Sequence, residues 1–327
     1  MKKVRFGIIG SNFIVDRFME AAKQCANAEI TAIYSRNKDK AQRLADEKGI
    51  PLSFDNLESF SDCREMDAVY IATPNSCHMK QTLMMLRKGK HVLCEKPLAS
   101  NFREAGIMFQ CAKDNGLFLM EAMRPVFHPA YQVIKEKLKE IGPIRQVTLS
   151  YCQYSSRYDK FKQGIVENAF NPALSNGSIM DIGCYPIHVM VMLFGIPEKM
   201  MSMGIKLPES IDGNGNILAH YGEFLVNIGY SKITNSYLAN EIQGEKGSIR
   251  FHNVSSPESI ICKIGNKEER IVMSVHKQDM IYELEQFVSA VQSGVYTDVY
   301  QSYSLETMKI MDDARKQMGI VFPADRL

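Results

Sequence analysis

Two short motifs carry residues that can move a proton or hold a charge. Glu95-Lys96-Pro97 follows a short apolar run, and Asp181-Ile182-Gly183-Cys184-Tyr185 lies much farther along the chain. A lysine at the carboxyl end of a parallel strand points into the crevice where open α/β sheets bind ligands. An aspartate and a tyrosine from a second domain could complete an acid/base site there. The two motifs predict Lys96, Asp181 and Tyr185 as catalytic residues.

Alternating strand and helix signals over residues 1–120 predict the sheet that positions Lys96. The expected strands are Val4–Ile9, Glu29–Tyr34, Asp67–Ala72, His91–Cys94 and Leu117–Met120. The expected helices are Ile14–Cys25, Asp39–Lys48, a helix capped by Ser76 that reaches Lys88, and Phe102–Asp114. This alternation is typical of a parallel sheet with crossover helices. We predict an α/β protein whose residues 1–120 form a doubly wound Rossmann domain for dinucleotide binding.

Residues 121–327 have a different pattern, with period-2 runs and fewer long helices. The expected strands are Ile144–Tyr154, Met200–Leu207, Gly215–Tyr230, Ser236–Glu241, Gly247–His252 and Ile260–Ile264. The expected helices are Tyr131–Glu140, Tyr185–Leu193, Asp279–Gln292 and Ser302–Met318. We predict an α/β domain with a large open, mostly antiparallel sheet for substrate binding and oligomerisation. Its last helices could pack back on the Rossmann domain.

A dinucleotide fingerprint is expected where the first strand turns into the first helix. Gly10 matches the first glycine of Gly-x-Gly-x-x-Gly, whereas Asn12 and Val15 occupy the other two glycine positions. Asn tolerates unusual backbone angles better than most residues, but its side chain limits how closely a pyrophosphate can approach. The pattern alone also fits an ordinary tight turn. The strand–helix series around it favours a nucleotide site.

The end of the second strand indicates which dinucleotide binds. NAD enzymes usually carry Asp or Glu there to bind the ribose 2′-hydroxyl. This chain has Tyr34-Ser35-Arg36, with Lys40 close behind. A hydroxyl and a guanidinium suit a 2′-phosphate, although Arg36 could also be a solvated loop charge. We predict NADP as the preferred cofactor and NAD as the alternative.

The remaining cofactor contacts are expected at the ends of the later strands. Ala72-Thr73-Pro74-Asn75 should line the nicotinamide half of the crevice, although it also fits an ordinary strand-to-helix turn. The predicted cofactor-binding residues are Gly10, Ser11, Asn12, Phe13, Ile14, Ser35, Arg36, Lys40, Thr73, Pro74, Asn75, His78, Glu95 and Lys96.

Four of these segments together resemble a known family. Gly7-Ile8-Ile9-Gly10, Ala72-Thr73-Pro74-Asn75, Glu95-Lys96-Pro97 and Ser178-Ile179-Met180-Asp181-Ile182-Gly183 are similar to motifs of the Gfo/Idh/MocA oxidoreductases. The resemblance implies a Rossmann domain followed by an α/β domain whose open sheet often forms the oligomer interface. It also implies hydride transfer between a nicotinamide and a sugar, polyol or related hydroxy compound.

Tyr185 departs from the histidine that the family often has four residues after the aspartate. This departure resembles the branch with dimeric dihydrodiol dehydrogenase and some NADP-linked aldose dehydrogenases, in which tyrosine is the proposed acid/base. A tyrosine with a pKa near 10 is a poor base at neutral pH, but a nearby ammonium favours the phenolate. We expect Lys96 to supply that charge and Asp181 to orient substrate or lysine. Tyr185 could instead be a core residue, and Asp181 a helix cap.

Substrate contacts are expected from Glu121, Arg124, Arg157 and His188. Glu121 and Arg124 mark the predicted domain junction, where ligand sites tend to lie, although hinge packing explains Glu121 almost as well. Arg157 could bind an anion or a hydroxyl, or remain a surface charge. His188 could share the helix face of Tyr185 as an alternative acid/base or be a packed histidine. No residues have metal-ligand spacing, so no metal is expected.

Composition limits the partners. The 327 residues are 45% hydrophobic and 23% charged, with a formal charge of +2, so neither nucleic acid nor an anionic membrane is an expected partner. The eight cysteines are scattered, and no secretory signal or membrane span is evident, so we expect a cytoplasmic protein. We expect a small-molecule substrate and a homodimer or homotetramer.

Two other functions remain open at this point. One is a glycoside-processing enzyme that uses a tightly held NAD for transient oxidation, although Tyr185 in the histidine position argues mildly against it. The other is a nucleotide-binding regulator without catalysis, which would not need Lys96, Asp181 and Tyr185 together. The leading hypothesis is an NAD(P)-dependent dehydrogenase or reductase acting on CH–OH groups of a sugar, polyol or cyclic diol.

Overall fold

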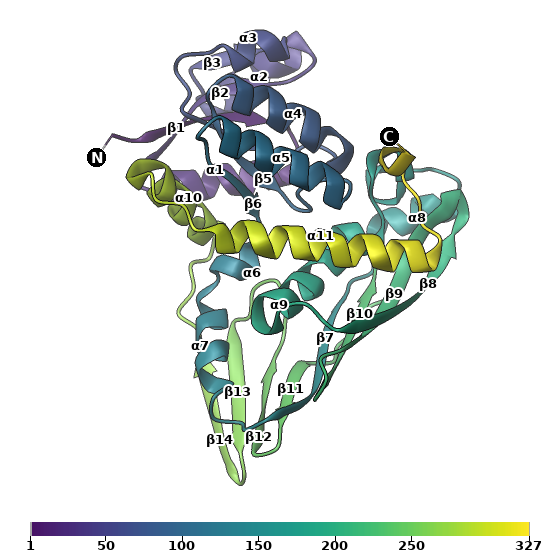
Figure 1. The fold of residues 1–327 in the computed structure, drawn as a ribbon. Helices are drawn as coiled ribbons and strands as arrows, with labels where there is room; N and C mark the ends of the chain where they lie inside the picture. Colours follow the sequence, from purple (N-terminus) through teal and green to yellow (C-terminus); the bar gives the residue numbers. More distant parts are fainter. Residues whose placement is uncertain (1, 327) are drawn as a thin grey trace. The chain divides into compact units, whose positions relative to one another are not determined.

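The computed structural model describes residues 2–326, which divide into two units (Figure 1). The first unit contains the residues up to Met123 together with His276–Ser302. The second contains Arg124–Val275 and the residues from Tyr303 onwards. The assignment of these parts to dinucleotide and substrate binding stays a prediction.

The first unit is built on a six-stranded parallel sheet in the order β3-β2-β1-β4-β5-β6. Its strands are β1 (Val4–Ile9), β2 (Ala28–Tyr34), β3 (Leu52–Phe54), β4 (Ala68–Ile71), β5 (His91–Glu95) and β6 (Leu119–Ala122). Its helices are α1 (Phe13–Gln24), α2 (Lys38–Lys48), α3 (Leu57–Ser61), α4 (Asn75–Arg87), α5 (Phe102–Asp114) and α10 (Ile281–Ser293). This is the predicted Rossmann sheet.

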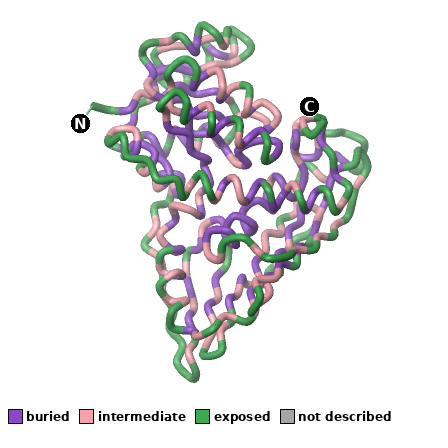
Figure 2. The backbone as a smooth tube through the Cα atoms, viewed as in Figure 1, coloured by how far each residue is buried: buried purple, intermediate pink, exposed green. Residues whose placement is uncertain are grey.

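The core of the first unit explains the apolar runs of its strands. Every residue of β4 and β6 is buried, as expected for parallel strands covered by helices on both faces (Figure 2). Helix α1 packs against α10, and α4 packs against α5 (Figure 1). Phe18 of α1 stacks on Tyr70 of β4 with ring centroids 3.8 Å apart. Strand β4 ends just before the predicted cofactor residues Thr73, Pro74 and Asn75.

The second unit contains an eight-stranded sheet in the order β14-β13-β12-β11-β7-β10-β9-β8. Its strands are β7 (Ile144–Cys152), β8 (Lys199–Leu207), β9 (Ile211–His220), β10 (Leu225–Ser231), β11 (Asn240–Gly244), β12 (Gly247–Phe251), β13 (Ser259–Ile264) and β14 (Lys267–Val272). Strand β10 pairs parallel with β7, and the other pairs are antiparallel. The predicted mostly antiparallel sheet is confirmed.

Helices of the second unit cover part of this sheet. They are α6 (Arg124–Phe127), α7 (Pro129–Lys137), α8 (Ser156–Lys162) and α9 (Cys184–Phe194), with a single π-helical turn, Ile179–Gly183, leading into α9. Helix α11 (Asp298–Met318) starts in the first unit and continues in the second. Pro172–Phe194 is long and apolar enough to cross a membrane, but 83% of its most apolar window is buried within the protein, as in a core helix.

Several predicted boundaries are wrong. The expected strand Gly215–Tyr230 is two strands, β9 and β10, because the chain reverses near Gly222, whose φ is +76°. Ser76 is not the cap of α4, since the helix already starts at Asn75, after Pro74. The sequence prediction also missed β3, α3 and β14, which are short or strongly charged.

Candidate active site

The turn after β1 has the close backbone approach expected of a dinucleotide fingerprint. Gly10 has φ +139°, and a Cβ atom there would lie 2.5 Å from the carbonyl oxygen of Ala72. Asn12, in the second glycine position, has an ordinary extended backbone with φ −97° and therefore does not require glycine. Its side chain accepts a hydrogen bond from the Ile14 amide at 3.1 Å and donates to the Ala72 carbonyl at 3.2 Å. Asn12 thus caps α1 and ties this turn to the end of β4.

The start of α1 exposes the other predicted phosphate contacts. Ser11 and Phe13 are exposed, and Phe13 retains 66% of its accessible surface. The first amides of a helix carry partial positive charge and commonly bind phosphate groups. This geometry suits a pyrophosphate at the end of β1, where the fingerprint predicts it.

Arg36 lies exposed just beyond the end of β2. Within residues 2–326, no hydrogen bond or ion pair involves its side chain. Ser35 is held in place because its amide donates to the Phe54 carbonyl at 3.0 Å. Lys40 lies in the first turn of α2, where its amide is capped by the Asn37 side chain at 2.8 Å. Two cations therefore lie beside β2 where NAD enzymes carry a carboxylate.

His78 connects two of the predicted cofactor loops. Its ring is fully buried, with Nε2 at 2.9 Å from the Thr73 carbonyl and Nδ1 at 3.1 Å from the Pro97 carbonyl. Burial lowers the pKa of His78, and a neutral imidazole can donate to one of these carbonyls at a time. His78 therefore holds the loops after β4 and β5 together, and its contact with a cofactor stays a prediction.

The chain around Lys96 is fixed by buried carboxylates. Glu95 accepts a hydrogen bond from the Tyr70 hydroxyl at 2.6 Å and from the Lys96 amide at 3.2 Å. Burial and the neighbouring Glu95 raise the pKa of Tyr70 well above its usual value, so Tyr70 stays a donor. Glu121 of β6 accepts from the Leu98 amide at 2.9 Å. Glu95 and Glu121, predicted as ligand contacts, thus help to position the Lys96 backbone.

In the second unit, Asp181 forms an ion pair with Lys232. The Lys232 ammonium, just after β10 and 4% exposed, donates to Oδ2 of Asp181. It also lies 5.8 Å from the centroid of the Phe170 ring. A buried ammonium needs such a partner, because an uncompensated charge away from water is costly. We expected Asp181 to orient substrate or Lys96, and Lys232 was not predicted as its partner.

Tyr185 lies in the first turn of α9 and is 5% exposed. Its hydroxyl oxygen is 3.2 Å from Nη2 of Arg124, and the guanidinium carbon is 5.6 Å from the ring centroid. The ring of Tyr151 lies 5.5 Å from that of Tyr185. Arg124 therefore places a cation beside the Tyr185 hydroxyl, and the charge expected there from Lys96 stays a prediction. Arg124 was predicted only as a substrate contact.

His188 and Arg157 have different environments. His188 is fully buried, 6.2 Å from the ring of Tyr303, and burial lowers its pKa to about 3. An imidazole with this pKa is a poor base near neutral pH, which argues against His188 as the acid/base. Arg157 is exposed in α8, where its amide is capped by the Ser155 hydroxyl at 3.3 Å. Substrate contacts of both residues stay predictions.

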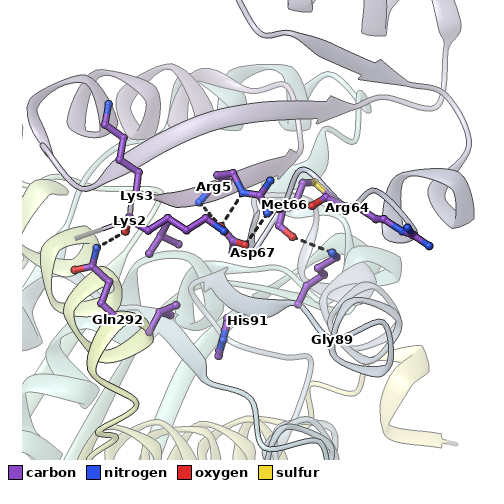
Figure 3. Close-up of a pocket in the computed structure, with 12 residues that line it drawn as sticks. Lys2, Lys3, Arg5, Arg64, Met66, Asp67, Gly89, His91 and Gln292 are labelled. Atoms are coloured by element: carbon purple, nitrogen blue, oxygen red, sulfur yellow. Dashed lines mark hydrogen bonds and ion pairs between the residues drawn. The ribbon is translucent and has the colours of Figure 1, made fainter.

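A surface cavity of about 640 Å³ lies at the amino ends of β1, β4 and β5 (Figure 3). Arg5 binds both oxygens of Asp67, and the Lys90 ammonium donates to the Met66 carbonyl at 2.8 Å (Figure 3). Arg5 also pairs with Glu65 at 2.7 Å. Ligands of open α/β sheets bind at the carboxyl ends of the strands, which is the opposite edge. The charged side chains that line this cavity are already paired with one another, which indicates a structural network.

Residues 2–326 contain no group of His, Cys, Asp and Glu that could hold a metal ion.

Comparisons with known proteins agree with this geometry. Residues 4–123 match the oxidoreductase family with an NAD-binding Rossmann fold, and residues 131–250 match the Gfo/Idh/MocA C-terminal domain. The chain is 44% identical to scyllo-inositol 2-dehydrogenase (NADP(+)) IolU of Bacillus subtilis, over 99% of both chains. It is 25% identical to mouse trans-1,2-dihydrobenzene-1,2-diol dehydrogenase, also over 99% of both.

A solved structure has the same fold. The 3-ketoreductase KijD10 of Actinomadura kijaniata, in complex with NADP and TDP-benzene, superimposes with a TM-score of 0.87 and 24% identity. The match covers 97% of this chain and 98% of that chain. The predicted resemblance, the α/β fold class and the nicotinamide cofactor are confirmed. The chain belongs to the Gfo/Idh/MocA family and is a nicotinamide-dependent oxidoreductase.

Proposed function

We propose that this protein is an NADP-dependent dehydrogenase acting on a CH–OH group of a polyol, sugar or cyclic diol, with a cyclic polyol as the preferred class. The observation that carries this proposal is the Tyr185 hydroxyl, 3.2 Å from Arg124, on the same helical segment as Asp181, which is paired with Lys232. These groups can donate to and accept from several hydroxyls of one substrate. The scyllo-inositol dehydrogenase at 44% identity supports the choice of substrate class.

In the proposed reaction, different groups handle the proton and the hydride. In the oxidation direction Tyr185 takes the hydroxyl proton as a phenolate stabilised by Arg124. Lys96 donates a hydrogen bond to the reacting oxygen, and Asp181, held by Lys232, accepts from a neighbouring hydroxyl. The predicted cofactor residues after β1, β2 and β4 would hold the nicotinamide coenzyme, which would supply the hydride acceptor for the substrate carbon. In the reduction direction Tyr185 returns the proton.

NADP is favoured by the cations after β2. Replacing Arg36 by alanine is expected to raise the Kd for NADPH about 10- to 100-fold and to leave the Kd for NADH almost unchanged, because only NADPH carries the 2′-phosphate. The magnitude corresponds to loss of charge-assisted hydrogen bonds worth about 1.5–3 kcal/mol. Both Kd values are measured from the fluorescence of the coenzyme itself, because the chain has no tryptophan whose emission could report binding. Arg43→Ala, an exposed arginine on α2, is the matched control. Equal weakening of both coenzymes by Arg36→Ala would contradict the assignment.

The second unit also supports a homodimer or homotetramer. Strand β8 alternates exposed apolar side chains, with Met201 71%, Met203 78% and Ile205 55% exposed. Met201 pairs with Leu218 of β9, which is 41% exposed on the same face. An apolar patch on a sheet edge usually marks an interface.

We expect Met203→Asp to convert the oligomer to monomers, because the interface would bury an unpaired carboxylate. Size-exclusion chromatography with light scattering gives the mass directly. Val295→Asp, at a residue of the first unit that is 73% exposed, should keep the wild-type mass. An unchanged mass for Met203→Asp would show that this face is not the interface.

We place the enzyme in the cytoplasm, with neither nucleic acid nor membrane as a partner.

The substrate class is tested by following NADP⁺ reduction at 340 nm with scyllo-inositol, myo-inositol, D-xylose, D-glucose and a trans-dihydrodiol. Turnover with a cyclitol well above the aldoses and the diol supports the proposed preference. Turnover confined to aldoses or diols would leave a CH–OH dehydrogenase and overturn the cyclitol assignment. A purified protein that keeps its coenzyme and shows no net reduction would instead favour transient oxidation of a glycoside.

A further inference from the structure

A buried carboxylate at the start of β9 contacts the segment that carries Asp181 and Tyr185. Asp212, the second residue of β9, is 1% exposed. Its Oδ2 accepts a hydrogen bond of 2.6 Å from the amide of Ile179, the first residue of the π-helical turn. A Cβ atom on Gly177 would lie 2.2 Å from Oδ1 of Asp212, and Gly177 has φ +132°. The chain before the turn is therefore shaped to admit this carboxylate.

Gly213, the next residue of β9, binds the backbone of Lys232, which is the ion-pair partner of Asp181. The Gly213 carbonyl accepts a hydrogen bond of 2.9 Å from the amide of Lys232. Gly177, whose Cα side faces Asp212, in turn accepts a hydrogen bond at its carbonyl from the Asp181 amide at 3.0 Å. Asp212 and Gly213 of β9 thus bind the two backbone segments that carry Asp181 and Lys232.

We propose that Asp212 is a positioning residue for the reaction, whose carboxylate fixes the π-helical turn and so sets the placement of Asp181 and Tyr185. This inference rests on the proposed function. A carboxylate accepting an amide hydrogen forms a charge-assisted bond, which is shorter and stronger than a neutral one. The second oxygen, Oδ1, has no hydrogen-bond partner among residues 2–326. A protonated or amide side chain would therefore gain no second hydrogen bond at this position.

The charges around Asp212 give the proposal a measurable pH dependence. Burial raises the pKa of Asp212 to about 6, opposed by the Ile179 amide and by Arg315 of α11. Tyr230 of β10 also faces it, and burial together with Asp212 raises the pKa of Tyr230 well above its usual value. As the pH falls through about 6, Asp212 takes up a proton and the charge-assisted bond to Ile179 is lost. We expect kcat to fall over the same range.

Asp212 affects stability and kcat in opposite directions as the pH changes. Because the pKa is raised on folding, from 3.8 to about 6, the folded protein gains stability from this group at low pH and loses it as the pH rises through about 6. Asp212→Asn removes the buried charge, so the Tm at pH 8 should stay the same or increase. A purely structural role would lower the Tm and kcat together.

The test compares Asp212→Asn with wild type and with Asp313→Asn, the same change at an exposed residue of α11. At pH 8 we expect Asp212→Asn to lower kcat about tenfold, with an unchanged Kd for NADPH and without the decline of kcat near pH 6. Asp313→Asn should behave as wild type. An Asp212→Asn enzyme with wild-type kcat, or one that retains the decline near pH 6, would overturn the proposal. Wild-type protein that turns over no substrate would instead overturn the proposed function.

Discussion

Tyr185→Phe is expected to lower kcat about 100- to 10,000-fold, the usual contribution of a positioned general acid or base. The substitution keeps the ring against Tyr151 and removes only the hydroxyl that lies 3.2 Å from Arg124. Coenzyme binding should not change, because the predicted coenzyme contacts lie in the first unit. Stopped-flow measurement of hydride transfer at saturating substrate separates the chemical step from binding.

The control for this experiment is Tyr221→Phe, which removes a hydroxyl that donates to the Gly195 carbonyl at 2.8 Å in the same unit. It should keep the wild-type rate of hydride transfer. A Tyr185→Phe enzyme with most of the wild-type kcat would show that another group moves the proton. His188 would be a poor replacement, since burial lowers its pKa to about 3.

Lys96→Met is expected to reduce kcat about 100-fold or more, because preorganised donors to a reacting oxygen contribute about this much. Methionine keeps most of the apolar stem and removes the ammonium. The backbone should stay in place, since Glu95 and Glu121 hold the amides of Lys96 and Leu98.

Lys80→Met, at an exposed position of α4, is the matched control for Lys96→Met and should leave kcat unchanged. The Kd for NADPH separates two roles of Lys96. A large loss of kcat with little change in Kd assigns the ammonium to the reacting oxygen. Retention of kcat with a weaker Kd would make Lys96 a coenzyme contact only.

Much of the fold could be predicted because buried strands are continuous apolar runs and turns carry glycine. The prediction of Phe102–Asp114 as a helix matches α5, which Asn101 caps and Asn115 follows. Strand β14 was missed because Lys267–Val272 is strongly charged and exposed at the sheet edge, where no apolar alternation is required. Strand β3 has only three residues, too few to show a period.

The site was only partly predictable for a different reason. Lys96, Asp181 and Tyr185 stand in recognisable motifs, whereas Lys232 follows an ordinary strand and becomes important only by pairing with Asp181, 51 residues earlier. Asp212 stands in Ile211-Asp212-Gly213-Asn214, which resembles a polar turn in sequence. Such partners depend on strand pairing, here β9 with β10, and periodicity does not indicate which strands pair.

Direct hydride transfer between a CH–OH carbon and NADP can be followed with an isotope label on the substrate. Scyllo-inositol carrying deuterium on its ring carbons is incubated with the enzyme and NADP⁺, and the reduced coenzyme is analysed by mass spectrometry. We expect one deuterium in each NADPH formed and a slower transfer than with unlabelled substrate. Reduced coenzyme without deuterium, or no reduction with any cyclitol, aldose or diol, would contradict it.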